Sequence, residues 1–131
     1  MEFKYKEIFD YINDDEILKS NFKDEKIPNL EIIDKMKKLM EYGKIVCISE
    51  TWCKDCKRDV PKLGKMAEFL PKWEFLVLKR DDESVKSTFS VTAIPTTIIY
   101  DTQNNELGRI IENKKYTCLE EDILRIIKKS Y

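Results

Sequence analysis

At 131 residues the chain has the size of one compact domain and is long enough to bury a hydrophobic core, so we expect a single domain over residues 1–131. Its 24 basic and 25 acidic residues leave a net charge of −1, a balance that indicates neither a nucleic acid nor an anionic membrane as the partner. The N-terminal residues are too charged for a secretory signal, and no apolar run approaches the ~18 residues of a membrane span. We therefore expect a cytoplasmic protein.

Residues 1–43 have the pattern of helices. Apolar residues at helical spacing predict a first helix over residues 3–19, with Asn13-Asp-Asp15 as a potential break. The polar stretch 21–29 contains Pro28 and predicts a loop. A second apolar stripe predicts another helix that ends near Met40, and Gly43 is placed to terminate it as the C′ residue. No strong strand pattern precedes residue 44, so the first 43 residues are expected to form a helical N-terminal part.

Residues 44–131 alternate between strands and helices. The β-branched run 44–49 predicts a buried strand, and an apolar stripe that ends near Leu70 predicts the helix after it. A second buried strand is expected over residues 73–78, and a short helix over 82–89. Strands at 97–100 and 107–111 are joined by a polar turn, and a last helix opens at Thr117 with Glu120 three residues on.

The motif Trp52-Cys53-Lys54-Asp55-Cys56 lies between the first buried strand and its helix. This placement puts Cys53 at a helix N-terminus, where unpaired backbone N–H groups and the macrodipole favour a thiolate. Cys53 is therefore the expected nucleophile. Cys56, one turn into the helix, is the expected resolving thiol, because two cysteines at this spacing can close a disulfide.

Two other uses of a Cys-x-x-Cys pair compete with the redox interpretation: half of a zinc site, and two buried structural thiols. A structural zinc site needs four ligands. The chain has no histidine, and its remaining cysteines, Cys47 and Cys118, stand alone and far apart. We therefore favour redox chemistry, with no metal and no cofactor.

The sequence resembles the thioredoxin-like superfamily from about Lys44 to the C-terminus. A strand directly precedes Trp-Cys-x-x-Cys, Pro61 falls five residues after the second cysteine, and Ile94-Pro95-Thr96 precedes an apolar strand. The motif Trp-Cys-Lys-Asp-Cys is most similar to a small prokaryotic branch. The resemblance implies an α/β thioredoxin-like fold: a central four-stranded mixed sheet flanked by helices, with residues 44–131 as the thioredoxin-like core and residues 1–43 as a helical extension.

The resemblance also implies roles for residues around the cysteines. Pro95 would follow a cis peptide bond, so that the backbone at Ile94 can pair with an extended substrate segment. Trp52 would contact substrate beside the cysteines. Lys54 and Asp55 would tune the reactivity of Cys53 in opposite directions, because only the lysine favours the thiolate. The run Lys79-Arg80-Asp81-Asp82 is interpreted as a solvated strand end.

The predicted function is thiol–disulfide exchange: an enzyme that reduces protein disulfides, acts as a monomer and is recycled by a reductase that the sequence does not identify. Two alternatives stay open. One is a glutaredoxin-like reductase that uses a small thiol, although such proteins usually carry Cys-Pro-Tyr-Cys. The other is an interaction module of the same fold without redox turnover.

One position departs from the family. Thioredoxins have a buried carboxylate six residues before the first active cysteine, where this chain has Cys47. A buried thiol is mostly neutral at pH 7 and is a poor proton acceptor. We therefore expect Cys47 to act in core packing, and Cys56 to lose its proton to water or to a surface carboxylate such as Glu50 or Asp55.

Overall fold

The computed structural model of the chain describes residues 3–111 and 118–131. Its strands are β1 (Lys6–Glu7), β2 (Lys44–Ser49), β3 (Glu74–Lys79), β4 (Thr96–Tyr100) and β5 (Glu106–Ile111). Its helices are α1 (Ile8–Asn13), α2 (Glu16–Asp24), α3 (Leu30–Leu39), α4 (Lys54–Phe69), α5 (Glu83–Phe89) and α6 (Leu119–Ser130). None of the helices in these parts of the chain is long and apolar enough to cross a membrane.

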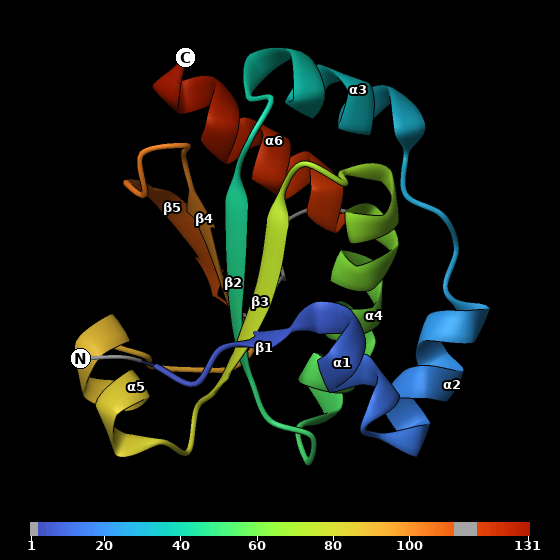
Figure 1. Cartoon of the computed structure of the whole chain (residues 1–131), viewed down its shortest axis with the longest axis vertical. Helices are drawn as coiled ribbons and strands as arrows, with labels where there is room; N and C mark the ends of the chain where they lie inside the picture. The colour runs from blue at the N-terminus through green and yellow to red at the C-terminus, as the bar shows by residue number, and fades with distance from the viewer. Residues whose placement is uncertain (1–2, 112–117) are drawn as a thin grey trace.

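The strands form one mixed sheet in the order β1-β3-β2-β4-β5 (Figure 1). β2 and β3 run parallel, with Ser49 opposite Lys79, whereas β4 pairs antiparallel with both β2 and β5. The predicted four-stranded mixed sheet is confirmed by β2 to β5. Because β2 and β3 are parallel, their C-terminal ends meet at the same edge of the sheet, and the residues that follow both strands become neighbours.

Helices cover both faces of the sheet, and the alternation of side chains along β2 divides the core in two. Ile45 and Cys47 point into a large core that contains residues of α1, α3, α4 and α6. Val46 and Ile48 point into a smaller core that contains Val85 of α5. In Figure 1, α5 accordingly lies on the opposite side of the strands from α4.

The N-terminal part differs from its prediction. A helix from residue 3 is wrong, because Lys6 and Glu7 form the edge strand β1, which pairs antiparallel with β3. The potential break at residues 13–15 is real, since Asp15 caps α2 by accepting a hydrogen bond from the backbone N–H of Leu18 at 3.0 Å. α2 also continues through residues 21–24, which the polar composition had assigned to a loop.

Gly43 does not serve as the C′ residue of α3. That helix ends at Leu39 with Met40 as its C-cap, and no glycine in the described residues has a positive φ. Gly43 is instead required by close packing, because a Cβ there would lie 2.9 Å from the Trp73 ring and 2.8 Å from Cε of Met40. The predicted N-cap Thr117 lies outside the described residues, and α6 begins after Cys118.

Pro61 lies inside α4 and cannot donate a backbone hydrogen bond to the carbonyl of Lys57, four residues earlier. Asn21 of α2 supplies the missing donor, because its Nδ2 donates to the Lys57 carbonyl at 3.2 Å. This bond joins α2 to the N-terminal half of α4.

Candidate functional site

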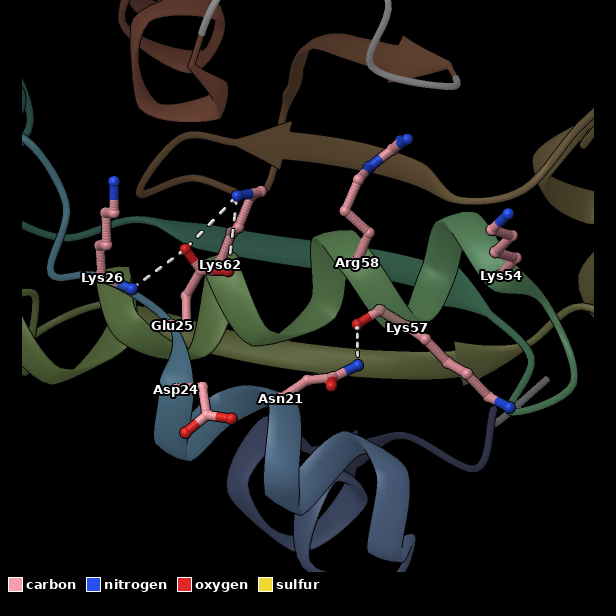
Figure 2. A pocket seen from close by; sticks show the side chains of 8 residues that line it. All are labelled: Asn21, Asp24, Glu25, Lys26, Lys54, Lys57, Arg58 and Lys62. Carbon is pink, nitrogen blue, oxygen red and sulfur yellow. Dashed lines mark hydrogen bonds and ion pairs between the residues drawn. The ribbon is translucent and has the colours of Figure 1, made fainter.

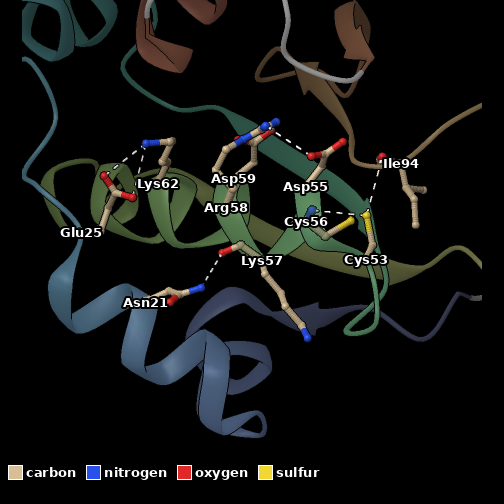
Figure 3. Close-up of polar contacts among 10 residues, drawn as sticks. All are labelled: Asn21, Glu25, Cys53, Asp55, Cys56, Lys57, Arg58, Asp59, Lys62 and Ile94. Atoms are coloured by element: carbon tan, nitrogen blue, oxygen red, sulfur yellow. Dashed lines mark hydrogen bonds and ion pairs between the residues drawn. The ribbon is translucent and has the colours of Figure 1, made fainter.

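The local sequence places Cys53 as the N-cap of α4. β2 ends at Ser49, residues 50–52 turn the chain, and the backbone N–H of Cys53 donates to the Glu50 carbonyl at 3.2 Å. Cys53 Sγ then accepts a hydrogen bond from the backbone N–H of Cys56 at 3.4 Å (Figure 3). An N-cap side chain normally satisfies one of the unpaired donors of the first turn, and here a sulfur atom does so.

The two thiols of the motif differ in exposure. Cys53 is half-buried, whereas Cys56 is only 1% exposed. Burial raises the pKa of the Cys56 thiol to about 12, and the adjacent Cys53 adds to the rise while the Ser49 hydroxyl opposes it. Cys47, Cys53, Cys56 and Cys118 are all free thiols. The pair is therefore a dithiol with one reachable sulfur and one that is buried and protonated.

The loop before β4 lies across from Cys53. The Ile94–Pro95 peptide bond is cis, and Cys53 Sγ lies 3.9 Å from the Ile94 carbonyl oxygen (Figure 3). Thr96 Oγ1 donates to the Ala93 carbonyl at 2.6 Å and fixes the loop from within. The structure thus brings together the cysteine pair and the Ile94-Pro95 segment, which are about forty residues apart in sequence.

Trp52 is exposed at 60% and is held by residues that follow β3. Its Nε1 donates to Asp81 Oδ2 at 3.2 Å, and the Arg80 guanidinium lies 5.5 Å from the ring centroid. The hydrogen bond from Trp52, together with Arg80, lowers the pKa of the Asp81 carboxyl. The run of residues 79–82 is a solvated strand end, as interpreted, and Arg80 and Asp81 in addition contact Trp52. The parallel pairing of β2 with β3 explains the contact, because Trp52 and Asp81 both follow strand ends at one edge.

Lys54 and Asp55 occupy the first turn of α4. Asp55 Oδ1 accepts from Arg58 Nη1 at 3.3 Å, so part of its charge is neutralised within the helix. Lys54 is exposed, has no ion pair within the described residues, and lies at the N-terminal end of α4, where it points away from α2 (Figure 2).

Buried polar groups lie on the inner side of the dithiol, and the sequence analysis missed most of them. The Tyr11 hydroxyl of α1 lies 3.2 Å from Ser49 Oγ, at the end of β2. Burial raises the pKa of Tyr11, and the thiols of Cys47 and Cys56 act in the same direction. The phenol therefore stays neutral and can take part in the hydrogen bonding around Cys56.

Asp59 is a buried carboxylate on α4, one turn after Cys56. It is only 1% exposed, and it accepts a bidentate pair of hydrogen bonds from Arg58, at 2.8 Å from Nε and 3.2 Å from Nη2 (Figure 3). Residues three apart on a helix share a face, so Cys56 and Asp59 point in similar directions. This spacing was the available signal in the sequence.

Glu50 is not the surface carboxylate that the sequence suggested. It is only 7% exposed, and its Oε2 accepts from the Asp81 backbone N–H at 2.9 Å. Within residues 3–111 and 118–131, no three side chains of the metal-ligating types are grouped so that they could hold a metal ion.

A mixed sheet with helices on both faces, and a cysteine pair at the start of the helix after the central strand, defines the class of thioredoxin-fold proteins. A family model described as thioredoxin matches residues 7–117. The chain therefore belongs to the thioredoxin family. No curated protein sequence matches it.

Solved structures share this fold at low sequence identity. A protein of unknown function from Pseudomonas aeruginosa is 15% identical with a TM-score of 0.76, and the match covers 96% of this chain and 93% of that one. A thioredoxin from Fasciola hepatica is 24% identical with a TM-score of 0.55, covering 74% of this chain and 89% of that one. Mitochondrial thioredoxin 3 from Saccharomyces cerevisiae is 22% identical with a TM-score of 0.54, covering 83% and 98%. These likenesses confirm the predicted thioredoxin-like fold.

Proposed function

We propose that this protein is a thiol–disulfide oxidoreductase that reduces protein disulfides through Cys53 and Cys56. One observation carries the proposal: Cys53 Sγ caps the N-terminus of α4 and accepts a hydrogen bond from the backbone N–H of Cys56. A donor aimed at the sulfur, together with the helix macrodipole, stabilises a thiolate. The half-buried position of Cys53 leaves this sulfur within reach of a substrate.

The reaction proceeds in two exchanges. The Cys53 thiolate attacks one sulfur of the substrate disulfide, the substrate S–S bond breaks, and the other substrate sulfur leaves as a thiolate that takes up a proton. Cys56 then loses its proton and attacks Cys53 Sγ. The mixed disulfide breaks, the second substrate thiol is released, and a Cys53–Cys56 disulfide forms. The substrate gains two electrons and two protons, which an external dithiol reductant must restore to the protein.

The surroundings of Cys53 support an extended protein segment as the substrate. The Ile94 carbonyl lies beside Cys53 Sγ and can accept a backbone hydrogen bond from a bound chain. The exposed Trp52 ring, held by Asp81, gives the substrate a fixed apolar surface. The inaccessible, protonated state of the Cys56 thiol fits its role as the second nucleophile, since it acts only after Cys53 has been linked to substrate.

The proposal is tested with single-cysteine variants and a protein disulfide substrate, in the presence of a recycling dithiol. We expect Cys53→Ser to abolish turnover and Cys56→Ser to stall as a mixed disulfide that mass spectrometry detects. Limiting alkylation at neutral pH should label Cys53 before the other cysteines. Cys118→Ser, a change at the N-cap of α6, is the matched control and should retain turnover.

Three results would contradict the proposal. They are preferential alkylation of Cys47 or Cys118, turnover that survives Cys53→Ser, and stoichiometric zinc that is lost when either motif cysteine is replaced. The last result would assign the pair to metal binding.

A further inference from the structure

A positively charged cleft lies between α2 and α4 (Figure 2), and two of its residues, Lys54 and Lys57, directly follow Cys53 and Cys56 in the chain. The cleft is wide open to solvent, with a volume of about 640 Å³, and five cationic side chains line it: Lys26, Lys54, Lys57, Arg58 and Lys62. We call these five residues the basic cleft. Its residues come from two segments that only the fold brings together, so the sequence alone does not indicate it.

Some cations of the basic cleft are neutralised by ion pairs and others are not. Lys62 pairs with Glu25 at 3.3 Å, and Arg58 pairs with Asp55 and Asp59. Lys26, Lys54 and Lys57 make no ion pair with any residue in the described parts of the chain. Five cations line the cleft against two carboxylates, Asp24 and Glu25, and Glu25 pairs with Lys62, so the remaining positive charge favours an anionic ligand.

The walls of the basic cleft are fixed to each other. Asn21 of α2 donates to the Lys57 carbonyl, and the Lys62–Glu25 pair bridges the same two elements further along α4 (Figure 3). Neither wall has to move to keep the hollow open. A preformed site of this kind spares a ligand the cost of ordering it.

The basic cleft starts where thiol exchange would take place. Lys54 follows Cys53 and Lys57 follows Cys56 in the chain, and in the view of Figure 3 the Lys57 side chain and Ile94 lie on opposite sides of Cys53. From residue 54 to residue 62 the helix rises about 12 Å, the length of about four extended residues. A chain whose cysteine is joined to Cys53 can therefore lay its next few residues along these lysines.

We propose that the basic cleft binds an acidic segment of the disulfide substrate, within about four residues of the cysteine that Cys53 attacks. The inference rests on the proposed function and adds a preference for substrates with carboxylates beside the disulfide. Asp24 and Glu25 also line the hollow. These two carboxylates would repel a ligand with a negative charge on every unit, such as a nucleic acid. A peptide whose carboxylates are spaced apart can contact the lysines without approaching Asp24 and Glu25.

The test compares two peptide disulfides, one with Asp and Glu within four residues of the cysteine and one with Asn and Gln at the same positions. Each peptide is made in two versions, one with these polar residues before the cysteine and one with them after it. For the parent protein we expect kcat/KM to be about threefold to tenfold higher for the acidic peptide, with an advantage that shrinks as salt is added. The ratio cancels any change in the intrinsic reactivity of Cys53.

The double variant Lys26→Glu/Lys57→Glu should lose or reverse this ratio. The matched control is Lys38→Glu/Lys128→Glu, which changes the net charge equally through exposed lysines of α3 and α6 and should keep the ratio. Equal kcat/KM for the two peptides in the parent protein overturns the inference while leaving the proposed function intact. Loss of the preference in the control pair also overturns it, because overall charge would then explain the effect. If neither peptide is reduced, the proposed function itself has failed.

Discussion

Cys47 is fully buried on β2, on the face of the sheet that packs against α4. Burial raises the pKa of its thiol, and the nearby Cys56 and Asp59 add to this effect while Thr97 opposes it. Cys47 is therefore a neutral thiol at pH 7 and a weak proton acceptor. The buried carboxylate in this region comes from α4, as Asp59, rather than from β2.

We expect Cys47→Ala to lower the free energy of unfolding by about 1–2 kcal/mol, because a buried sulfur is lost, and to keep the neutral-pH reduction rate within a few-fold. Urea unfolding and the pH–rate profile measure the two effects. A rate loss of tenfold or more in folded protein, which is about 1.4 kcal/mol of barrier, would instead give Cys47 a chemical role.

At the residue scale, the sequence was informative wherever the chemistry is local. The spacing of Cys53 and Cys56, and a strand directly before them, are sufficient to predict a cysteine at a helix N-terminus. The contact of Trp52 with Asp81 and that of Tyr11 with Ser49 depend on pairing between distant segments. Composition and periodicity do not indicate which distant segments pair, so these contacts could not be predicted.

At the scale of elements, α2 packs against α4 through Gly64, which allows the helices to approach closely. A Cβ at this position would lie 2.8 Å from Cδ1 of Ile12 and 2.9 Å from Cε1 of Phe22. Ile12 is buried in the core, and the Lys65 ammonium lies over the Phe22 ring at 4.1 Å from its centroid. A movement of either side chain would disturb these contacts.

We therefore expect Gly64→Ala to destabilise the protein. Alanine improves helix propensity by about 1 kcal/mol, but overpacking at a filled contact costs about 1–3 kcal/mol, so a net loss of up to about 2 kcal/mol should appear in urea unfolding. Phe22→Leu shortens the opposing ring, and the double variant should lose less stability than the sum of the two single variants. If Gly64→Ala is more stable than the parent protein, the neighbouring side chains can move to accommodate the added methyl group, and the prediction is wrong.

The accuracy of the element predictions followed the strength of the local pattern. β2 and β3 are continuous apolar runs, and both were predicted within a residue of their bounds. β1 has two exposed residues, Lys6 and Glu7, and exists only because the edge of β3 is there to pair with it. α2 was shortened in the prediction because the stretch 21–29 is mostly polar, although residues 21–24, which include Phe22, form the end of a helix that lies against α4.

At the scale of the whole molecule, the mixed sheet separates two cores, and both contain ionisable groups that are neutral at pH 7: Cys47 and Tyr11 in the larger core, and Cys56 in the smaller one. The pKa values of Cys47 and Tyr11 are raised by burial, and that of Cys56 is raised to about 12. Each group holds its proton more tightly in the folded protein than in the unfolded chain. The stability they provide is therefore complete below the unfolded pKa, about 8.5 for a thiol and about 10 for tyrosine, and falls as the pH rises beyond it.

We expect the reduced protein to lose stability above about pH 8.5 at up to about 1.4 kcal/mol per pH unit for each of the two buried thiols, because the unfolded chain releases these protons first. Urea unfolding with a reductant, between about pH 7 and about pH 10, measures the slope. Cys47→Ala removes one of the two thiols and should flatten it. Val46→Ala, on the opposite face of β2, is the matched control: it should lower stability at every pH without changing the slope. If Cys47→Ala and Val46→Ala give the same slope, the Cys47 thiol does not contribute to the alkaline destabilisation, and its pKa is not raised in the folded protein.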